Sequence, residues 1–208
     1  MAVYESTHSL VKHKISLLRD HNISIKAFRE LAQEVSTMLT MEATRDLPLE
    51  NKPLTCWSGD ISTPFFAGKQ PTLVPILRAG LGMLDGALKI VPCAKISVVG
   101  IQRNEETLAA ESYYENVVSD VAERTAIIVD PMLATGGTAK STMDLLKESG
   151  CKKILAVFLV AAPEGIAHIE QYHPDVDMYI GAIDSKLNDK GYILPGLGDA
   201  GDKIFGTL

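Results

Sequence analysis

Residues 125–141, which read TAIIVDPMLATGGTAKS, combine residue types that suit a phosphate-binding loop. An apolar strand is predicted to end in Asp130, and the segment TGGT at residues 135–138 then precedes a predicted helix. The start of a helix has unpaired backbone N–H groups and the positive end of the helix dipole, which together favour an anion. Paired glycines let the backbone approach phosphate oxygens, and the threonine hydroxyls add donors. We therefore expect this turn to bind a phosphate.

The same turn also has a purely structural interpretation. A threonine ahead of a helix can satisfy its orphan amides without any ligand. The loop lacks the GK[ST] segment of nucleoside-triphosphate loops, so a site of that kind is excluded. A Gly-Gly turn alone fits both interpretations. The longer pattern around it, DPMLATGG at residues 130–137, favours the phosphate-binding interpretation.

Two arginines that follow predicted strands could bind further phosphates. Arg78 follows the strand at residues 72–77, and Arg103 opens a polar hairpin at residues 103–116. A guanidinium donates a fork of hydrogen bonds that fits pyrophosphate, and a hairpin can close over a leaving group. The alternatives are an ordinary surface residue for Arg78 and an ion pair with the neighbouring glutamates for Arg103.

The chain ends in a glycine-rich segment, GYILPGLGDAGDKIFGT at residues 191–207. Glycine and proline leave many main-chain groups outside regular structure, and these groups could hydrogen-bond the carbonyls and N–H groups of a flat base. Tyr192 and Ile193 could supply an apolar contact to the ring. A packed surface tail is the alternative interpretation.

No metal site is predicted from side chains. The three cysteines are far apart, and the five histidines show no ligand spacing. Asp184, Asp189 and Asp202 are interpreted as acidic residues of a solvated loop.

Periodic apolar residues predict the elements that position these side chains. Residues 24–46 have helical spacing, with Ser24 as N-cap, and residues 10–19 form a shorter helix. After Pro71, apolar runs alternate with helical segments, which indicates a parallel sheet covered on both faces. The predicted strands are residues 72–77, 95–101, 126–129, 154–161 and 176–183, and the predicted helices are residues 82–90, 137–149 (closed by Gly150) and 164–172.

We therefore expect one α/β domain over residues 1–208, with a central, mostly parallel sheet flanked by helices. A helical arm at residues 1–50 is expected to pack on the main body or on a second subunit. The core sheet covers residues 71–183, and a flap covers residues 184–208. In such a sheet the phosphate loop lies at the carboxyl ends of the strands, where ligands bind.

Composition limits the class of protein. The 208 residues are 46% hydrophobic, which suffices for one substantial core. The net charge of -6 and the pI of about 5.4 argue against a nucleic-acid or membrane-surface partner. The N-terminus lacks the apolar stretch of a secretory signal, and no apolar run approaches the roughly 20 residues of a membrane span. We expect a cytoplasmic protein.

The longer pattern at residues 130–137, DPMLATGG, resembles the phosphoribosyl-pyrophosphate signature of the uracil phosphoribosyltransferase family, a type I phosphoribosyltransferase family. Most type I members have two adjacent acidic residues here, whereas Asp130 is followed by Pro131. Further matching segments occur in the family order along nearly the whole chain: PILRAGLGM (75–83), RNEET (103–107), VAAPEG (160–165) and GYILPGLGDAGDKIFGT (191–207).

The resemblance implies transfer of the phosphoribosyl group of phosphoribosyl pyrophosphate (PRPP) to uracil, giving UMP and pyrophosphate in pyrimidine salvage. It implies Mg²⁺ carried on the pyrophosphate, a homo-oligomer and, in some members, allosteric activation by GTP. Asp130 is the implied catalytic residue. The implied PRPP-binding residues are Arg78, Arg103, Asp130, Pro131, Met132, Leu133, Ala134, Thr135, Gly136, Gly137, Thr138 and Asp199. The implied uracil-binding residues are Ile193, Gly198, Asp199 and Ala200.

Two other functions compete with this one. Orotate or a purine could be the base, although the carboxylate of orotate would favour a cation in the base pocket, and Lys203 is the one cation in residues 191–207. A non-catalytic regulator that binds nucleotide or RNA should have a basic face, which this composition does not indicate.

Overall fold

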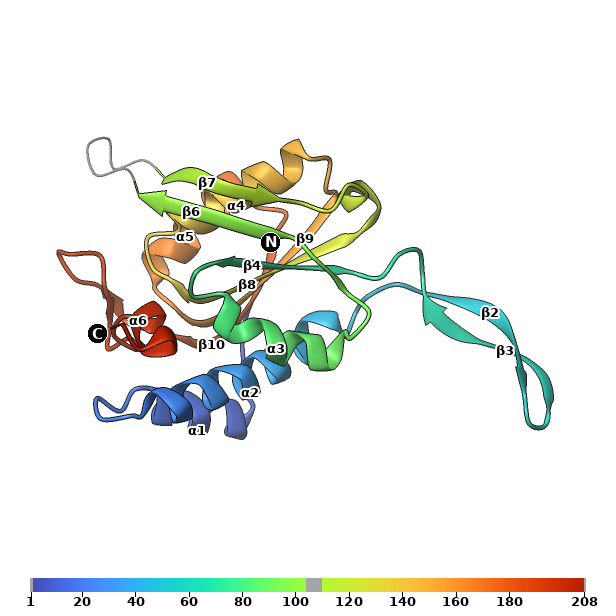
Figure 1. The fold of residues 1–208 in the computed structure, drawn as a ribbon, viewed down its shortest axis with the longest axis horizontal. Helices are drawn as coiled ribbons and strands as arrows, with labels where there is room; N and C mark the ends of the chain where they lie inside the picture. Colours follow the sequence, from blue (N-terminus) through green and yellow to red (C-terminus); the bar gives the residue numbers. More distant parts are fainter. Residues whose placement is uncertain (1, 104–109, 208) are drawn as a thin grey trace.

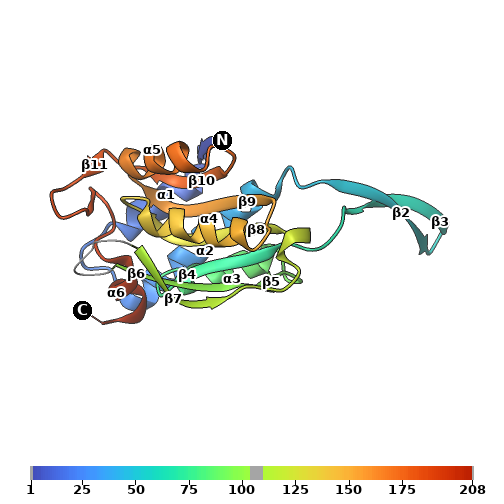
Figure 2. The same cartoon turned by 90° about the horizontal axis from the view of Figure 1, so that it is seen from above.

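The central strands are apolar on both faces, and this fixes a layered architecture. In β8 (Thr125–Leu133), Ile127 and Val129 belong to one buried cluster, and Ala126 and Ile128 belong to another. Alternate residues of a strand point to opposite faces, so both faces of the sheet need a cover. The computed structural model, which describes residues 2–103 and 110–207, supplies helices on both sides (Figures 1 and 2).

The described residues form an eight-stranded sheet with the order β1-β10-β9-β8-β4-β6-β7, and β5 pairs with β4. Every pair is parallel except the β6–β7 hairpin. This confirms the predicted mostly parallel sheet. The remaining strands are β1 (Val3–Glu5), β4 (Thr72–Leu77), β5 (Lys95–Ile96), β6 (Val98–Arg103), β7 (Ala110–Asn116), β9 (Lys153–Ala161) and β10 (Asp177–Ile183).

One face of the sheet is covered by α1 (Ser9–Leu18), α2 (Ile25–Thr44) and α3 (Leu81–Ile90), and the other by α4 (Gly137–Glu148) and α5 (Pro163–Tyr172). The N-cap of α2 is as predicted, because the Ser24 hydroxyl accepts a hydrogen bond from the Ala27 amide at 3.2 Å. Gly150 follows α4 with a φ of 90°, also as predicted. Within the described ranges, none of the helices is long and apolar enough to cross a membrane.

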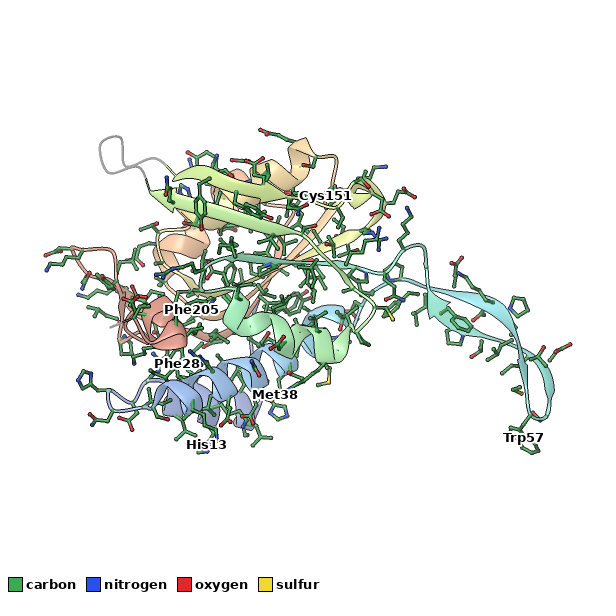
Figure 3. All side chains as sticks on the ribbon, in the orientation of Figure 1. His13, Phe28, Met38, Trp57, Cys151 and Phe205 are labelled. Carbon is green, nitrogen blue, oxygen red and sulfur yellow. The ribbon has the colours of Figure 1, made fainter. Side chains whose placement is uncertain are left out.

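A long hairpin of β2 (Leu49–Cys56) and β3 (Gly59–Phe66) projects from the body (Figure 1). Trp57 lies at its tip, far from the other labelled side chains (Figure 3), and is 99% exposed. The sequence predicted no element here, since both strands contain a proline and neither has a buried face to impose alternation.

The prediction that the phosphate-loop strand ends in Asp130 is wrong, because β8 continues to Leu133. Pro131 has no N–H group and would normally interrupt a central strand. Here the pairing of β8 with β4 stops at Val129, and beyond that point β8 pairs only with β9. The missing donor therefore falls where β8 has one neighbouring strand fewer, and the loop begins three residues later than predicted.

The C-terminal flap contains elements that its glycine-rich sequence did not predict. These are the small hairpin of β11 (Lys186–Leu187) and β12 (Ile193–Leu194), and the short helix α6 (Ala200–Phe205). The solvated-loop interpretation is wrong for Asp184, which is only 7% exposed. Its carboxylate is paired with Arg19 of the N-terminal arm.

Candidate active site

The predicted phosphate loop connects β8 to α4 at the carboxyl edge of the sheet. Gly136 is the N-cap of α4 and has a left-handed φ of 83°, which glycine adopts without strain. Neither Thr135 nor Thr138 caps the helix, and in the described part of the chain neither hydroxyl has a hydrogen-bond partner. The purely structural interpretation of these threonines is therefore wrong. The amides and hydroxyls remain available to an anion.

The loop encloses a hollow of about 80 Å³. Pockets for whole small molecules typically measure roughly 300–1,000 Å³, so this one has room for a single phosphate-sized group. Its lining consists of the end of β8, the loop and the first turn of α4: Asp130, Met132, Leu133, Ala134, Thr135, Gly136, Thr138 and Ala139.

Close packing of α5 holds the loop in place. A Cβ atom at Gly165 would lie 2.3 Å from the carbonyl oxygen of Ala134, so only glycine lets the helix approach this closely. The Ala162 amide donates to the carbonyl of Leu133 at 2.9 Å. Gly136 of the loop also packs against His168 of α5. The VAAPEG segment at residues 160–165 carries no local signal of this supporting contact.

Asp130 lines the same hollow from β8, and the residue as a whole is partly exposed. Burial of the carboxyl raises its pKa to about 7, although a hydrogen bond from the Met132 amide opposes the shift. A carboxyl with such a pKa responds strongly to a nearby cation, because positive charge favours its ionised form. Asp130 is thus placed to interact with a polar, charged ligand beside the phosphate loop.

Arg78 lies in the turn between β4 and α3, at the same edge of the sheet. Gly80 makes this turn possible, because a Cβ atom there would lie 2.5 Å from the Val129 carbonyl oxygen. The Arg78 side chain is 60% exposed, its Nη2 atom is 3.7 Å from Asp202, and its guanidinium lies 5.7 Å from the centre of the Phe205 ring. It faces the flap and is open to a ligand on its other side.

The flap packs onto this edge of the sheet. Ile193 and Ala200 are buried in the cluster that also contains Ala79, Met132 and Ala134. The Asp199 carboxylate caps α6 by accepting from the Asp202 amide at 2.9 Å, and α2 holds α6 through a hydrogen bond from Arg29 to the Ile204 carbonyl.

The tip of the flap also reaches the phosphate loop. A Cβ atom at Gly191 would be 3.8 Å from the Thr135 methyl group. The structure therefore brings together Asp130, the phosphate loop, Arg78 and the flap.

The Arg103 prediction stays a prediction. Its backbone ends β6 opposite Ala110, but its side chain lies outside the described residues, as do Glu105 and Glu106. Among the residues that are described, no group of three or more histidine, cysteine or acidic side chains could hold a metal ion.

Solved phosphoribosyltransferases share this fold. A hypoxanthine phosphoribosyltransferase from Trypanosoma cruzi, complexed with the product IMP, is 12% identical with a TM-score of 0.53 over 76% of each chain. A hypoxanthine-guanine phosphoribosyltransferase from Bacillus anthracis is 15% identical with a TM-score of 0.52, covering 77% of this chain and 80% of that one. The fold is therefore that of the type I phosphoribosyltransferases.

The family model for uracil phosphoribosyltransferase matches residues 5–207, so the chain belongs to the uracil phosphoribosyltransferase family. It is also similar to the solved AQ2163 protein from Aquifex aeolicus, at 40% identity and a TM-score of 0.92, over 98% of this chain and 97% of that one.

Proposed function

We propose that the protein transfers the phosphoribosyl group of PRPP to uracil, giving UMP and pyrophosphate. The observation that carries the proposal is the uncapped start of α4, which forms a phosphate-sized hollow beside Asp130. A sugar phosphate bound there would extend toward Arg78 and the flap, which lie at the same edge of the sheet.

The ligand groups are assigned to the side chains and amides nearest to them. The 5′-phosphate binds to the amides and hydroxyls of residues 135–138, and Asp130 accepts hydrogen bonds from the ribose hydroxyls. Arg78 and Arg103 bind the pyrophosphate, which suits guanidinium forks. Residues 131–134 shape the sugar site, and Asp199 contacts PRPP from the flap.

In the reaction, the bond from the anomeric carbon to pyrophosphate breaks and a bond to a uracil nitrogen forms. Positive charge develops on the anomeric carbon, by analogy with the oxocarbenium-like states of glycosyl transfer. The Asp130 carboxylate, beside the ribose, would stabilise that charge when ionised, and the arginines would stabilise the departing anion. Orientation of the two substrates supplies the remainder of the rate enhancement. The uracil nitrogen that forms the new bond loses its proton, and no residue is assigned as the general base for this step.

Mg²⁺ is the proposed cofactor. The carboxylates of Asp130 and Asp199 provide oxygen donors at this edge, which fits an ion that takes most of its ligands from substrate and water. When bound to the pyrophosphate it would neutralise part of the leaving charge.

The flap is the proposed uracil site, with contacts from Ile193, Gly198, Asp199 and Ala200. Backbone groups around Gly198, whose φ is 74°, could pair with the carbonyls and N–H groups of uracil. Lys203 keeps orotate as the second candidate base, because its ammonium would lie 3.8 Å from a Cβ atom at Gly198 as well as 5.5 Å from the centre of the Phe28 ring on α2.

A panel of free bases tests the proposal. The protein is incubated with PRPP and labelled uracil, orotate, hypoxanthine or adenine, with and without Mg²⁺, and products are separated. We expect UMP from uracil in the presence of Mg²⁺. Faster turnover of another base would contradict the uracil assignment, and no nucleotide from any base would contradict the transferase assignment.

The protein is further proposed to be a cytoplasmic homo-oligomer. The projecting β2–β3 hairpin exposes apolar side chains, including Trp57 at its tip and Leu54 and Ile61 on its strands. An isolated two-stranded hairpin is marginally stable, and a second copy of the chain would cover it. A molar mass in solution equal to that of one chain would contradict this.

A further inference from the structure

A partly buried ion pair connects the N-terminal arm to the flap. Asp184 directly follows β10, and its amide donates to the Ala161 carbonyl at 2.8 Å, which ties it to the core sheet. Its carboxylate accepts from both terminal nitrogens of Arg19, at 2.9 and 2.6 Å. Arg19 is the C-cap residue of α1, and its side chain is 25% exposed.

The same two side chains hold both backbone groups of Gly196. The Gly196 amide donates to Asp184 Oδ2 at 2.9 Å, and the Gly196 carbonyl accepts from Arg19 Nη1, also at 2.9 Å. This places four hydrogen bonds on one charge pair. Charge-assisted, bidentate bonds of this kind are short and directional, so they specify a backbone position more tightly than apolar packing does.

Gly196 lies in the tight turn of the flap that follows β12. Its φ is 62°, and a Cβ atom there would lie 2.2 Å from the Ile193 carbonyl oxygen. The preceding Leu194 carbonyl accepts from the amide and hydroxyl of Ser185, at 3.0 and 2.7 Å. The turn that these hydrogen bonds fix therefore lies between Ile193 and Gly198, two of the positions proposed to contact the base.

We infer that Arg19 and Asp184 are positioning residues for the base: they fix the Gly196 turn and thereby set where the flap presents its backbone groups. The inference rests on the proposed function in identifying that base as uracil. Neither side chain lines the phosphate hollow, so their effect on PRPP is indirect. A displacement of about 1 Å at a substrate-positioning element can cost roughly 100-fold in rate.

The test compares Arg19→Ala, Arg19→Lys and Asp184→Asn with a control, Lys14→Ala. Lys14 lies on α1, the helix that Arg19 caps, and forms an ion pair with Glu34 of α2 at 2.5 Å, so the control removes a salt bridge without touching the flap. Arg19→Lys keeps the positive charge but loses the two-pronged hydrogen bonding of the guanidinium. Asp184→Asn keeps an acceptor for the Gly196 amide but loses the negative charge. These milder changes keep the test valid if Arg19→Ala fails to fold.

Two measurements are made on each variant: the apparent KM for uracil and for PRPP, and hydrogen exchange of residues 193–200. We expect Arg19→Ala to raise the KM for uracil about 10-fold or more, to change that for PRPP much less, and to accelerate exchange in the flap. The control should match the wild type in both. A wild-type KM for uracil, or equal increases for both substrates, would overturn the inference.

Hydrogen exchange separates this inference from the proposed function. If the wild-type protein makes no UMP, the uracil assignment fails, and exchange in the flap still tests positioning. Unchanged flap exchange in both Arg19 variants would then refute the role of the ion pair.

Discussion

Replacing Gly165 with alanine should displace the phosphate loop without unfolding the protein. In the structure α5 approaches the loop so closely that the added Cβ atom would lie 2.3 Å from the Ala134 carbonyl oxygen and 2.9 Å from that of Leu133. Both neighbours are backbone atoms of the loop or its strand, so a rotamer change cannot relieve the clash.

The size of the effect follows from this geometry. Ordinary contacts of a Cβ atom begin near 3.4 Å, so α5 and the loop must separate by about 1.1 Å. Overpacking of this kind costs about 1–3 kcal/mol of stability. A misplacement of about 1 Å in a substrate-binding element can cost roughly 100-fold, and we expect a loss of that order in kcat/KM for PRPP.

The assay measures kcat/KM for PRPP together with the free energy of unfolding. Ala167→Gly is the matched control, because this exposed residue of α5 does not face the loop and the change costs about 1 kcal/mol of helix stability. The control should lose stability and keep activity. If Gly165→Ala kept wild-type kinetics, or if both variants lost activity in proportion to stability, the loop would not be held as described.

Three further predictions concern the charged residues. Asp130→Asn should lower kcat by roughly 100-fold with an unchanged circular dichroism spectrum, since it removes charge beside the developing cation; near-normal turnover would exclude the ribose role. The raised pKa of Asp130, about 7 against an ordinary 3.8, means that the ligand-free folded state binds more protons between those values, so its stability should fall as pH rises through that window and level off above it. Urea unfolding should show that Asp130→Asn removes this slope, and equal slopes in both proteins would contradict the raised pKa. Arg103→Ala should raise the apparent KM for PRPP, whereas an effect confined to uracil would place Arg103 at the base.

The sequence predicted elements that have a strong apolar period or a clear cap. The β4 strand and the N-terminus of α2 at Ser24 were predicted to the residue, because burial on both strand faces and a side-chain cap leave local signals. The three-residue β1 strand and the exposed β2–β3 hairpin were not, since a short edge strand has no periodicity and a hairpin without a buried face has no alternation.

Predictions for the site divide along the same line. The turn at residues 135–138 and its place before a helix followed from glycines and threonines adjacent in sequence. Two features depend on contacts between distant segments, and no local pattern reveals them. These are the approach of Gly165 to the loop and the pairing of Asp184 with Arg19, which are 165 positions apart. Asp184 was misassigned for this reason.

A crystal structure of the protein with PRPP or UMP tests the central claim most directly. We expect the 5′-phosphate to lie in the hollow at the start of α4, within hydrogen-bonding distance of the amides of residues 136–138 and of the Thr135 and Thr138 hydroxyls. A phosphoribosyl group bound elsewhere, with this hollow containing only water, would contradict it.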